Sequence, residues 1–121
     1  MSETDLNRSI LLNYSTGPNR LFRNNIGAYK DERGNWIKYG VCNPGGSDQI
    51  GWHQVTITPE MVGCKVPVFF VVEGKFGRNK ATKDQLAFIA AVQRAGGIGV
   101  VAYSIGDVRA AIELWKPPAA V

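Results

Sequence analysis

The chain has 121 residues, a length that predicts one domain built around a single hydrophobic core. A hydrophobic fraction of 45% and a charged fraction of 20% are ordinary for a globular protein, and the longest apolar run, Val66 to Val72, is too short to cross a membrane. The net charge of +4 favours an anionic partner only weakly. Its distribution is more informative, because Lys75, Arg78, Lys80 and Lys83 fall within nine residues that lie beyond Glu73.

The N-terminal segment predicts a helix. Ser2 is a capping residue with Asp5 three positions on, and negative charge near a helix start suits the helix dipole. Leu6, Ile10 and Tyr14 recur at four-residue spacing and predict an apolar stripe. The helix should end before the turn at residues 17–19.

Strands are expected in the middle of the chain. A strand within residues 21–29 and another at residues 36–41 flank a turn at 31–35, which predicts a hairpin. A glycine-containing loop at 43–47 leads to Asp48 and to a strand-like run at 49–57. Thr58-Pro59-Glu60 predicts a short helical turn.

The second half predicts a strand–helix–strand unit. Residues 66–73 form an apolar strand, Thr82 and Gln85 form a capping box for a helix at 83–95, and residues 98–103 form a further strand. Ser104 caps a last helix that stops before Pro117. We therefore expect an α/β domain over residues 1–116 and a loose tail at 117–121.

An acid and a base stand two residues apart at the end of the apolar strand. Glu73 and Lys75 should share one face, about 6.5–7 Å apart at the backbone. A carboxylate in such a place can hold a hard divalent cation, and a lysine can position a water or stabilise developing negative charge. Asp48, which follows a Gly-Gly-Ser turn, is the best candidate for a second carboxylate.

These features resemble the PD-(D/E)xK nucleases, and in detail the virus-type replication-repair nuclease domain (VRR-NUC) in its stand-alone phage or viral form. The resemblance covers the chain from Glu3 to about Ile112. Its motifs stand in the expected order: Glu3; Arg23-Asn24-Asn25-Ile26-Gly27; Gly46-Ser47-Asp48-Gln49-Ile50-Gly51; Val72-Glu73-Gly74-Lys75; Thr82-Lys83-Asp84-Gln85; and Gly96-Gly97-Ile98-Gly99-Val100-Val101. One departure is Gly74, where the family often has a β-branched or apolar residue.

The resemblance implies a restriction-endonuclease-like core, with a mixed central sheet of about four to five strands flanked by helices. It also implies hydrolysis of DNA phosphodiester bonds with Mg²⁺ or Mn²⁺. Asp48 and Glu73 would be metal ligands, and Glu3 would reach the metal or its waters. Lys75 would assist the attacking water, and Gln85 would line the site. The substrate would be branched or flapped DNA, and the enzyme would be a homodimer. It would act in the cytoplasm, which for a viral protein is the cytoplasm of the host cell.

Phosphate contacts are expected from four cations. Three belong to the basic loop and the helix start that follow Lys75, and one opens the Arg-Asn-Asn segment: Arg78, Lys80, Lys83 and Arg23. A structural or surface role for Arg23 is equally plausible. Trp36, Trp52 and Trp115 are expected in the core or at an interface, with base stacking as an alternative for Trp52.

Structural interpretations compete with each of these roles. Glu73 and Lys75 could be a solvated ion pair, and Gln85 needs no function beyond capping its helix. Glu3 could serve only the helix dipole. For the whole chain, the main alternative is a catalytically silent nucleic-acid-binding module. A nucleotide-binding P-loop is disfavoured, because Phe69 stands where its first glycine should be.

Overall fold

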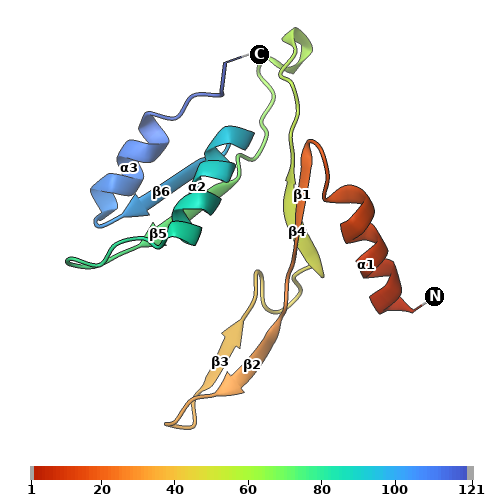
Figure 1. Cartoon of the computed structure of the whole chain (residues 1–121), viewed down its shortest axis with the longest axis vertical. Helices are drawn as coiled ribbons and strands as arrows, with labels where there is room; N and C mark the ends of the chain where they lie inside the picture. Colours follow the sequence, from red (N-terminus) through yellow and green to blue (C-terminus); the bar gives the residue numbers. More distant parts are fainter. Residues whose placement is uncertain (1, 120–121) are drawn as a thin grey trace. The chain divides into compact units, whose positions relative to one another are not determined.

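A computed structural model describes residues 2–119 of the chain (Figure 1). The chain contains both helices and strands, so the α/β class is confirmed, but the single strand expected within residues 21–29 is divided into two, β1 and β2. The elements are α1 (Glu3–Tyr14), β1 (Asn19–Arg23), β2 (Gly27–Lys30), β3 (Trp36–Tyr39), β4 (Gln49–His53), η1 (Pro59–Met61), β5 (Phe70–Gly74), α2 (Lys83–Ala95), β6 (Ile98–Ala102) and α3 (Ile105–Glu113). Neither α1, α2 nor α3 is long and apolar enough to cross a membrane.

The strands pair differently from the expected single mixed sheet. Within residues 2–119 they form three two-stranded sheets: β1 with β4 and β2 with β3, both antiparallel, and β5 with β6, parallel. β2 and β3 pair with each other across the turn that joins them. β1 pairs with β4, which follows the hairpin in the chain. The predicted sheet of about four to five strands is therefore not formed by these pairings.

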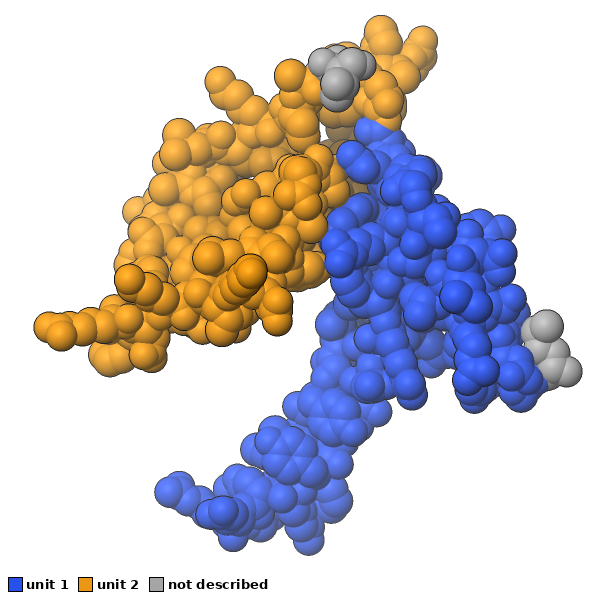
Figure 2. Space-filling view, viewed as in Figure 1, with its two compact units in different colours: residues 1–55 blue, residues 56–121 orange. Residues whose placement is uncertain are grey.

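The chain divides into two compact units, Met1–Val55 and Thr56–Val121 (Figure 2). Among the described residues, unit 1 holds α1 and two strand pairs, and unit 2 holds η1, α2, α3 and the β5–β6 pair. A single domain over residues 1–116 stays a prediction. Of the expected tail at 117–121, residues 120–121 lie outside the described part of the chain.

Unit 1 is built on α1 and the β1–β4 pair. Ser2 caps α1 as predicted: its hydroxyl accepts from the Asp5 amide at 3.1 Å, and the Asp5 carboxylate accepts from the Ser2 amide at 3.2 Å. These bonds hold the pKa of Asp5 below its ordinary value of 3.8. The predicted apolar stripe is only partly covered, because Leu6 and Tyr14 remain 49% and 61% exposed.

The β1–β4 pair carries the aromatic cluster of unit 1. The rings of Phe22 and Trp52 lie 5.8 Å apart, and the Arg20 guanidinium lies 5.3 Å and 5.7 Å from their centroids. Trp52 therefore packs within the unit, as expected. Trp36 does not pack in a core: it stands on β3 and is 66% exposed, because both faces of the β2–β3 hairpin are open.

Unit 2 is the predicted strand–helix–strand arrangement. β5 and β6 run parallel with Glu73 opposite Val101, and α2 connects them. The buried apolar side chains of the described chain, Ile89, Val92 and Ala102, all belong to this unit. β5 begins at Phe70 rather than at Val66, so the stretch around Pro67 precedes the strand.

Glycines bring the layers of unit 2 together. A Cβ on Gly97 would lie only 2.7 Å from both the Phe69 carbonyl oxygen and the Val92 side chain. Gly96 ends α2 with a φ of 104°, a left-handed conformation that favours glycine. The Trp115 indole then donates to the Gly96 carbonyl at 3.1 Å, which ties the segment after α3 to the end of α2.

Candidate functional site

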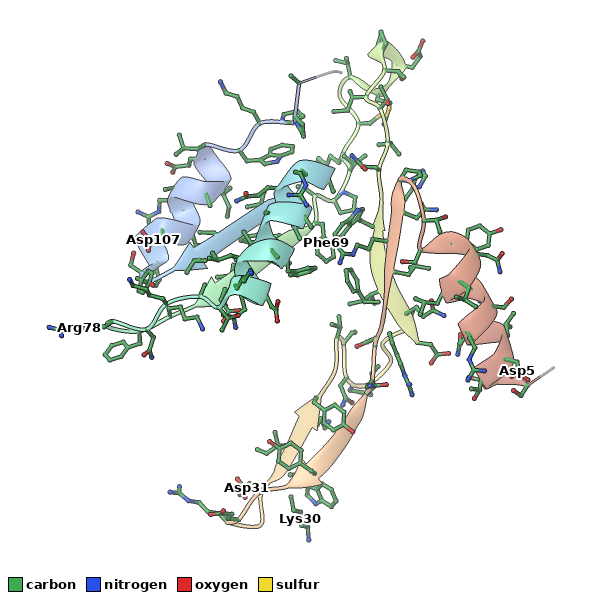
Figure 3. All side chains as sticks on the ribbon, viewed as in Figure 1. Asp5, Lys30, Asp31, Phe69, Arg78 and Asp107 are labelled. Carbon is green, nitrogen blue, oxygen red and sulfur yellow. The ribbon has the colours of Figure 1, made fainter. Side chains whose placement is uncertain are left out.

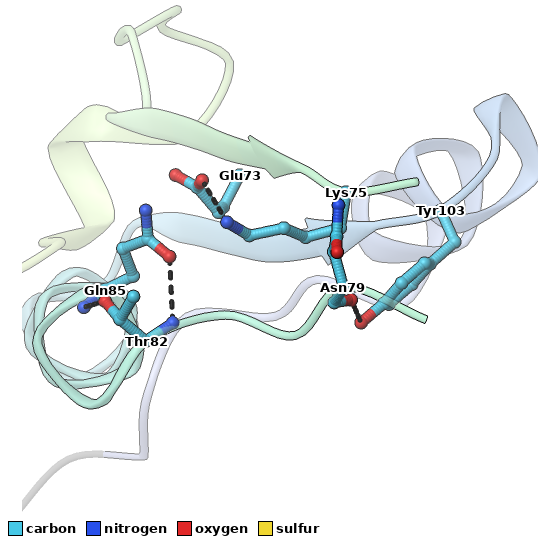
Figure 4. A network of polar contacts seen from close by, with 6 residues as sticks. All are labelled: Glu73, Lys75, Asn79, Thr82, Gln85 and Tyr103. Carbon is cyan, nitrogen blue, oxygen red and sulfur yellow. Dashed lines mark hydrogen bonds and ion pairs between the residues drawn. The ribbon is translucent and has the colours of Figure 1, made fainter. Parts of the chain in front are cut away.

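The predicted acid/base pair is present at the end of β5. Lys75 Nζ lies 3.2 Å from Glu73 Oε1, with the side chains 17% and 31% exposed, respectively (Figure 4). The Lys75 amide donates to the Ala102 carbonyl at 2.9 Å, so strand pairing continues one residue beyond β5. The two side chains therefore project from the same face of one strand, as predicted.

A hollow of about 330 Å³ opens beside Glu73. Its walls come from β5 and from the first turns of α2: Val71, Val72, Glu73, Asp84, Gln85, Phe88 and Ile89. Two carboxylates, Glu73 and Asp84, thus line the same hollow. Asp84 was not predicted as a site residue, although its place directly before Gln85 was a usable signal.

Gln85 has a clear structural role. Its side-chain oxygen accepts from the Thr82 backbone amide at 2.9 Å, and its backbone amide donates to the Thr82 hydroxyl at 3.1 Å (Figure 4). The capping box is therefore confirmed. Gln85 also lines the hollow with Glu73, so capping and a place at the site are compatible.

A hydrogen bond from Tyr103 holds the basic loop between β5 and α2. The Tyr103 hydroxyl donates to the Asn79 carbonyl at 2.7 Å, and the Asn79 amide donates to the Phe76 carbonyl at 3.2 Å. Arg78 stands at the outer end of this loop (Figure 3). Arg78, Lys80 and Lys83 are all exposed, as phosphate-binding side chains must be.

Asp48 lies in unit 1, immediately before β4, and is exposed. The Asn7 side-chain amide donates to its carboxylate at 3.1 Å. Asp48 and Arg23 line a hollow of about 600 Å³. The full lining is Thr4, Asn7, Arg8, Leu11, Arg23, Asn24, Asn25, Ile26, Gly45, Gly46, Asp48 and Gln49.

The helix face that lines this hollow was missed in the sequence. Thr4, Asn7, Arg8 and Leu11 follow the i, i+3, i+4, i+7 pattern of one helix face, which was the available signal. Glu3, the predicted further acid, occupies the first position of α1 and is exposed, but Thr4 rather than Glu3 lines the hollow. Arg8 is thus a second cation, after Arg23, in the lining of the hollow that Asp48 also lines.

Asn24 holds the Asp48 loop in place. It is 9% exposed, and its side-chain amide donates to the carbonyls of Val41 and Ser47, both at 3.0 Å. Its side-chain oxygen accepts from the Val41 amide at 2.9 Å, and its backbone amide donates to the Asp48 carbonyl at 2.8 Å. The Arg-Asn-Asn motif therefore positions the Gly-Ser-Asp motif.

The glycines of the Gly-Ser-Asp motif allow neighbouring backbone segments to lie close to the motif. A Cβ on Gly46 would collide with the Val41 carbonyl, and one on Gly51 with the Arg20 carbonyl of β1. The chain on either side of Asp48 is thus packed against backbone. The freedom expected from the Gly-Gly-Ser turn is present at Gly45, which has a φ of 101°.

The structure brings the predicted site residues together in two groups. Glu73, Lys75 and Gln85 meet in unit 2, and Asp48 and Arg23 meet in unit 1. Across residues 2–119, no three acidic, histidine or cysteine side chains cluster in a way that would hold a metal ion by themselves. Comparison of the chain with family models, curated proteins and solved structures finds no match.

Proposed function

We propose that the chain is a divalent-metal-dependent DNA endonuclease of the VRR-NUC type. The observation that carries the proposal is the Glu73–Lys75 pair, set at the end of a parallel strand and beside the start of α2. Removing both charges from water has a desolvation cost that can exceed their mutual attraction, so stability alone is a weak reason for this pair. The proposal of a restriction-endonuclease-like core is supported by the parallel β5–β6 pair and by α2, the helix that connects its two strands.

The proposed metal ligands are Asp48 and Glu73, with Glu3 reaching the metal or its waters. Carboxylates are the ligands that Mg²⁺ and Mn²⁺ take, and Asp48 already receives a hydrogen bond from Asn7, which would orient it. When bound, such a metal polarises a phosphate and lowers the pKa of a bound water.

Lys75 and Gln85 are the proposed groups that act beside the metal. The Lys75 ammonium, held by Glu73, would donate to the attacking water and stabilise charge that develops on the phosphate. Gln85 would orient Lys75 or the substrate from the wall of the hollow.

The proposed DNA contacts are electrostatic and independent of sequence. Arg78, Lys80 and Lys83 present exposed charges on and beside the basic loop, and Arg23 shares its hollow with Asp48. The substrate is proposed to be branched or flapped DNA, and the active form a two-fold homodimer in the cytoplasm. Ile105, Ile112 and Leu114, which are 80%, 48% and 78% exposed, offer apolar surface for such an interface.

A cleavage assay tests the proposal. Linear, flapped and four-way DNA are incubated with Mg²⁺ or Mn²⁺ and with the wild type, Asp48→Ala, Lys75→Ala or the exposed control Lys116→Ala. We expect metal-dependent nicking that falls about 100-fold in the two site variants, because each loses a group that acts on the reacting phosphate. The control should cut normally.

One alternative stays open to the same assay. A catalytically silent DNA-binding module would bind each DNA and cut none with either metal. The exposed basic loop favours DNA binding in both cases. Equal cleavage by wild type, Asp48→Ala and Lys75→Ala would show that the active site is not the one proposed.

A further inference from the structure

The β2–β3 hairpin presents two chemically different faces. Its register places Gly27 opposite Tyr39, Ala28 opposite Lys38, Tyr29 opposite Ile37 and Lys30 opposite Trp36. Residues two apart on a strand share a face. One face therefore carries Ala28, Lys30, Trp36 and Lys38, and we call it the basic face. The other carries Gly27, Tyr29, Ile37 and Tyr39, and we call it the tyrosine face.

The basic face combines an open aromatic ring with two ammonium groups. Trp36 is 66% exposed, and Lys30 Nζ lies 5.3 Å from the centroid of its ring. Ala28, Lys30 and Lys38 are exposed as well, and the face carries no acidic residue. Lys30 stands at the turn end of the hairpin (Figure 3).

The tyrosine face is uncharged and partly closed on itself. The Tyr29 and Tyr39 rings lie 6.4 Å apart, and Tyr39 covers Gly27, where an added Cβ would collide with its hydroxyl. The cations of the hairpin strands therefore all belong to the opposite side.

Hydrogen bonds fix both ends of the hairpin. At the base, the Asn43 side-chain amide donates to the carbonyls of Gly27 and Tyr39, each at 2.8 Å. At the turn, the Asp31 carboxylate accepts from the amides of Arg33 and Asn35 at 2.9 Å and 2.8 Å. An isolated two-stranded hairpin is marginally stable, so these bonds hold a surface that is presented rather than buried.

We propose that the basic face binds an unpaired nucleic-acid strand. Trp36 stacks on one base, and Lys30 and Lys38 contact the flanking phosphates. Proteins that hold single strands combine exposed aromatic rings with cations in this way. The strand must be unpaired because a ring can stack on a base only where the base has left the duplex stack.

A second copy of the chain fits the basic face poorly. A two-fold contact of this face with itself would bring four ammonium groups together, whereas a polyanion complements them. The inference rests on the proposed function for its biological use, since it names the flap or gap as the part of the DNA that is held. The binding itself requires neither the metal nor Lys75.

Binding without catalysis is the test. Fluorescence anisotropy is measured in EDTA with labelled oligo-dT, oligo-rU and a DNA duplex, which separates a DNA strand from an RNA strand and both from paired DNA. The variants are Trp36→Ala, Trp36→Phe and Lys30→Ala/Lys38→Ala. Tyr29→Ala on the tyrosine face is the matched control, and circular dichroism checks the fold of each.

Each variant has a distinct expected result. Trp36→Ala should weaken strand binding about ten- to hundredfold with the salt dependence unchanged, and Trp36→Phe should restore part of the loss. The double lysine variant should lower the slope of log K against log salt by about 1.4, which corresponds to two phosphates of a single strand. Tyr29→Ala should bind as the wild type does.

Four outcomes would overturn the inference. The first two are no strand binding by the wild type and unchanged binding in the basic-face variants. The others are an equal loss in Tyr29→Ala and a shift in oligomeric state in the basic-face variants, which would make this face a protein interface. None of these depends on cleavage, so the nuclease proposal succeeds or fails separately, in the assay with metal.

Discussion

Asn24 is the residue on which the surroundings of Asp48 depend most. It is a nearly buried amide, and its side chain makes three hydrogen bonds to the backbone of the loop that ends at Asp48. A buried polar group is stabilising only while its partners are present. The loop carbonyls at Val41 and Ser47 would lose a donor in any variant without the amide.

Asn24→Ala should lower the free energy of unfolding by about 2–3 kcal/mol, because it leaves the Val41 and Ser47 groups short of partners. Cleavage should fall with it, since the Asn24 side chain would no longer donate to the carbonyl of Ser47, the residue that directly precedes Asp48. Urea denaturation and the cleavage assay measure the two effects. Asn25→Ala, an exposed neighbour, is the control, and equal losses in both variants would show that the bonds of Asn24 are not responsible.

Gly74 separates the acid from the base, and it is a residue whose replacement should help. A Cβ there would meet nothing within 4 Å, and the Glu73–Lys75 pair forms despite the glycine. Gly74→Val should raise the free energy of unfolding by about 0.5–1 kcal/mol, because it restricts the unfolded chain and favours the strand. Gly97→Val is the contrasting variant and should destabilise, since its Cβ would lie 2.7 Å from the Phe69 carbonyl. A loss of stability in Gly74→Val, measured by urea denaturation, would contradict the open space beside β5.

At the scale of elements, local signals were sufficient for the helices and insufficient for the sheets. Ser2, Thr82 and Ser104 cap the three helices as the sequence predicts, because a cap depends on residues only three positions away. Strand partners are set by long-range pairing, so no pattern near β1 indicates that it joins β4. The exposure of Trp36 could not be predicted either, because it depends on whether a distant part of the chain packs against the hairpin.

The start of α2 allows capping to be separated from chemistry. Gln85→Ala removes the side-chain bond to the Thr82 amide and should lower the free energy of unfolding by about 1 kcal/mol. Gln85→Glu keeps the capping box, so its stability should match that of the wild type. If the amide of Gln85 orients Lys75 or the substrate, Gln85→Glu should still lose about tenfold in cleavage, because a third carboxylate in the hollow with Glu73 and Asp84 repels the phosphate. Full activity in Gln85→Glu, measured beside its thermal unfolding, would leave Gln85 with the capping role alone.

At the scale of the whole molecule, the two carboxylates proposed as metal ligands belong to different units. Asp48 belongs to unit 1 and Glu73 to unit 2, and 25 positions of chain separate them. Each carboxylate could be placed at the end of its own strand from local sequence, Asp48 just before β4 and Glu73 in β5, but only the family resemblance connects the two. The structure adds a competitor that the sequence did not suggest, because Asp84 lines the same hollow as Glu73 within unit 2.

Metal titration decides between these two ligand sets. Isothermal titration with Mn²⁺ should show that Asp48→Asn and Glu73→Gln each weaken binding by at least about tenfold, because even a lost outer partner of a metal ligand costs about 10- to 100-fold. Asp84→Asn should bind Mn²⁺ as the wild type does, which makes it the matched control for removing one negative charge beside Glu73. If Asp84→Asn and Glu73→Gln both lose binding while Asp48→Asn retains it, the ion belongs to the hollow of unit 2 alone. Asp48 would then have no part in holding the metal and would only line the unit 1 hollow, which Arg8 and Arg23 also line.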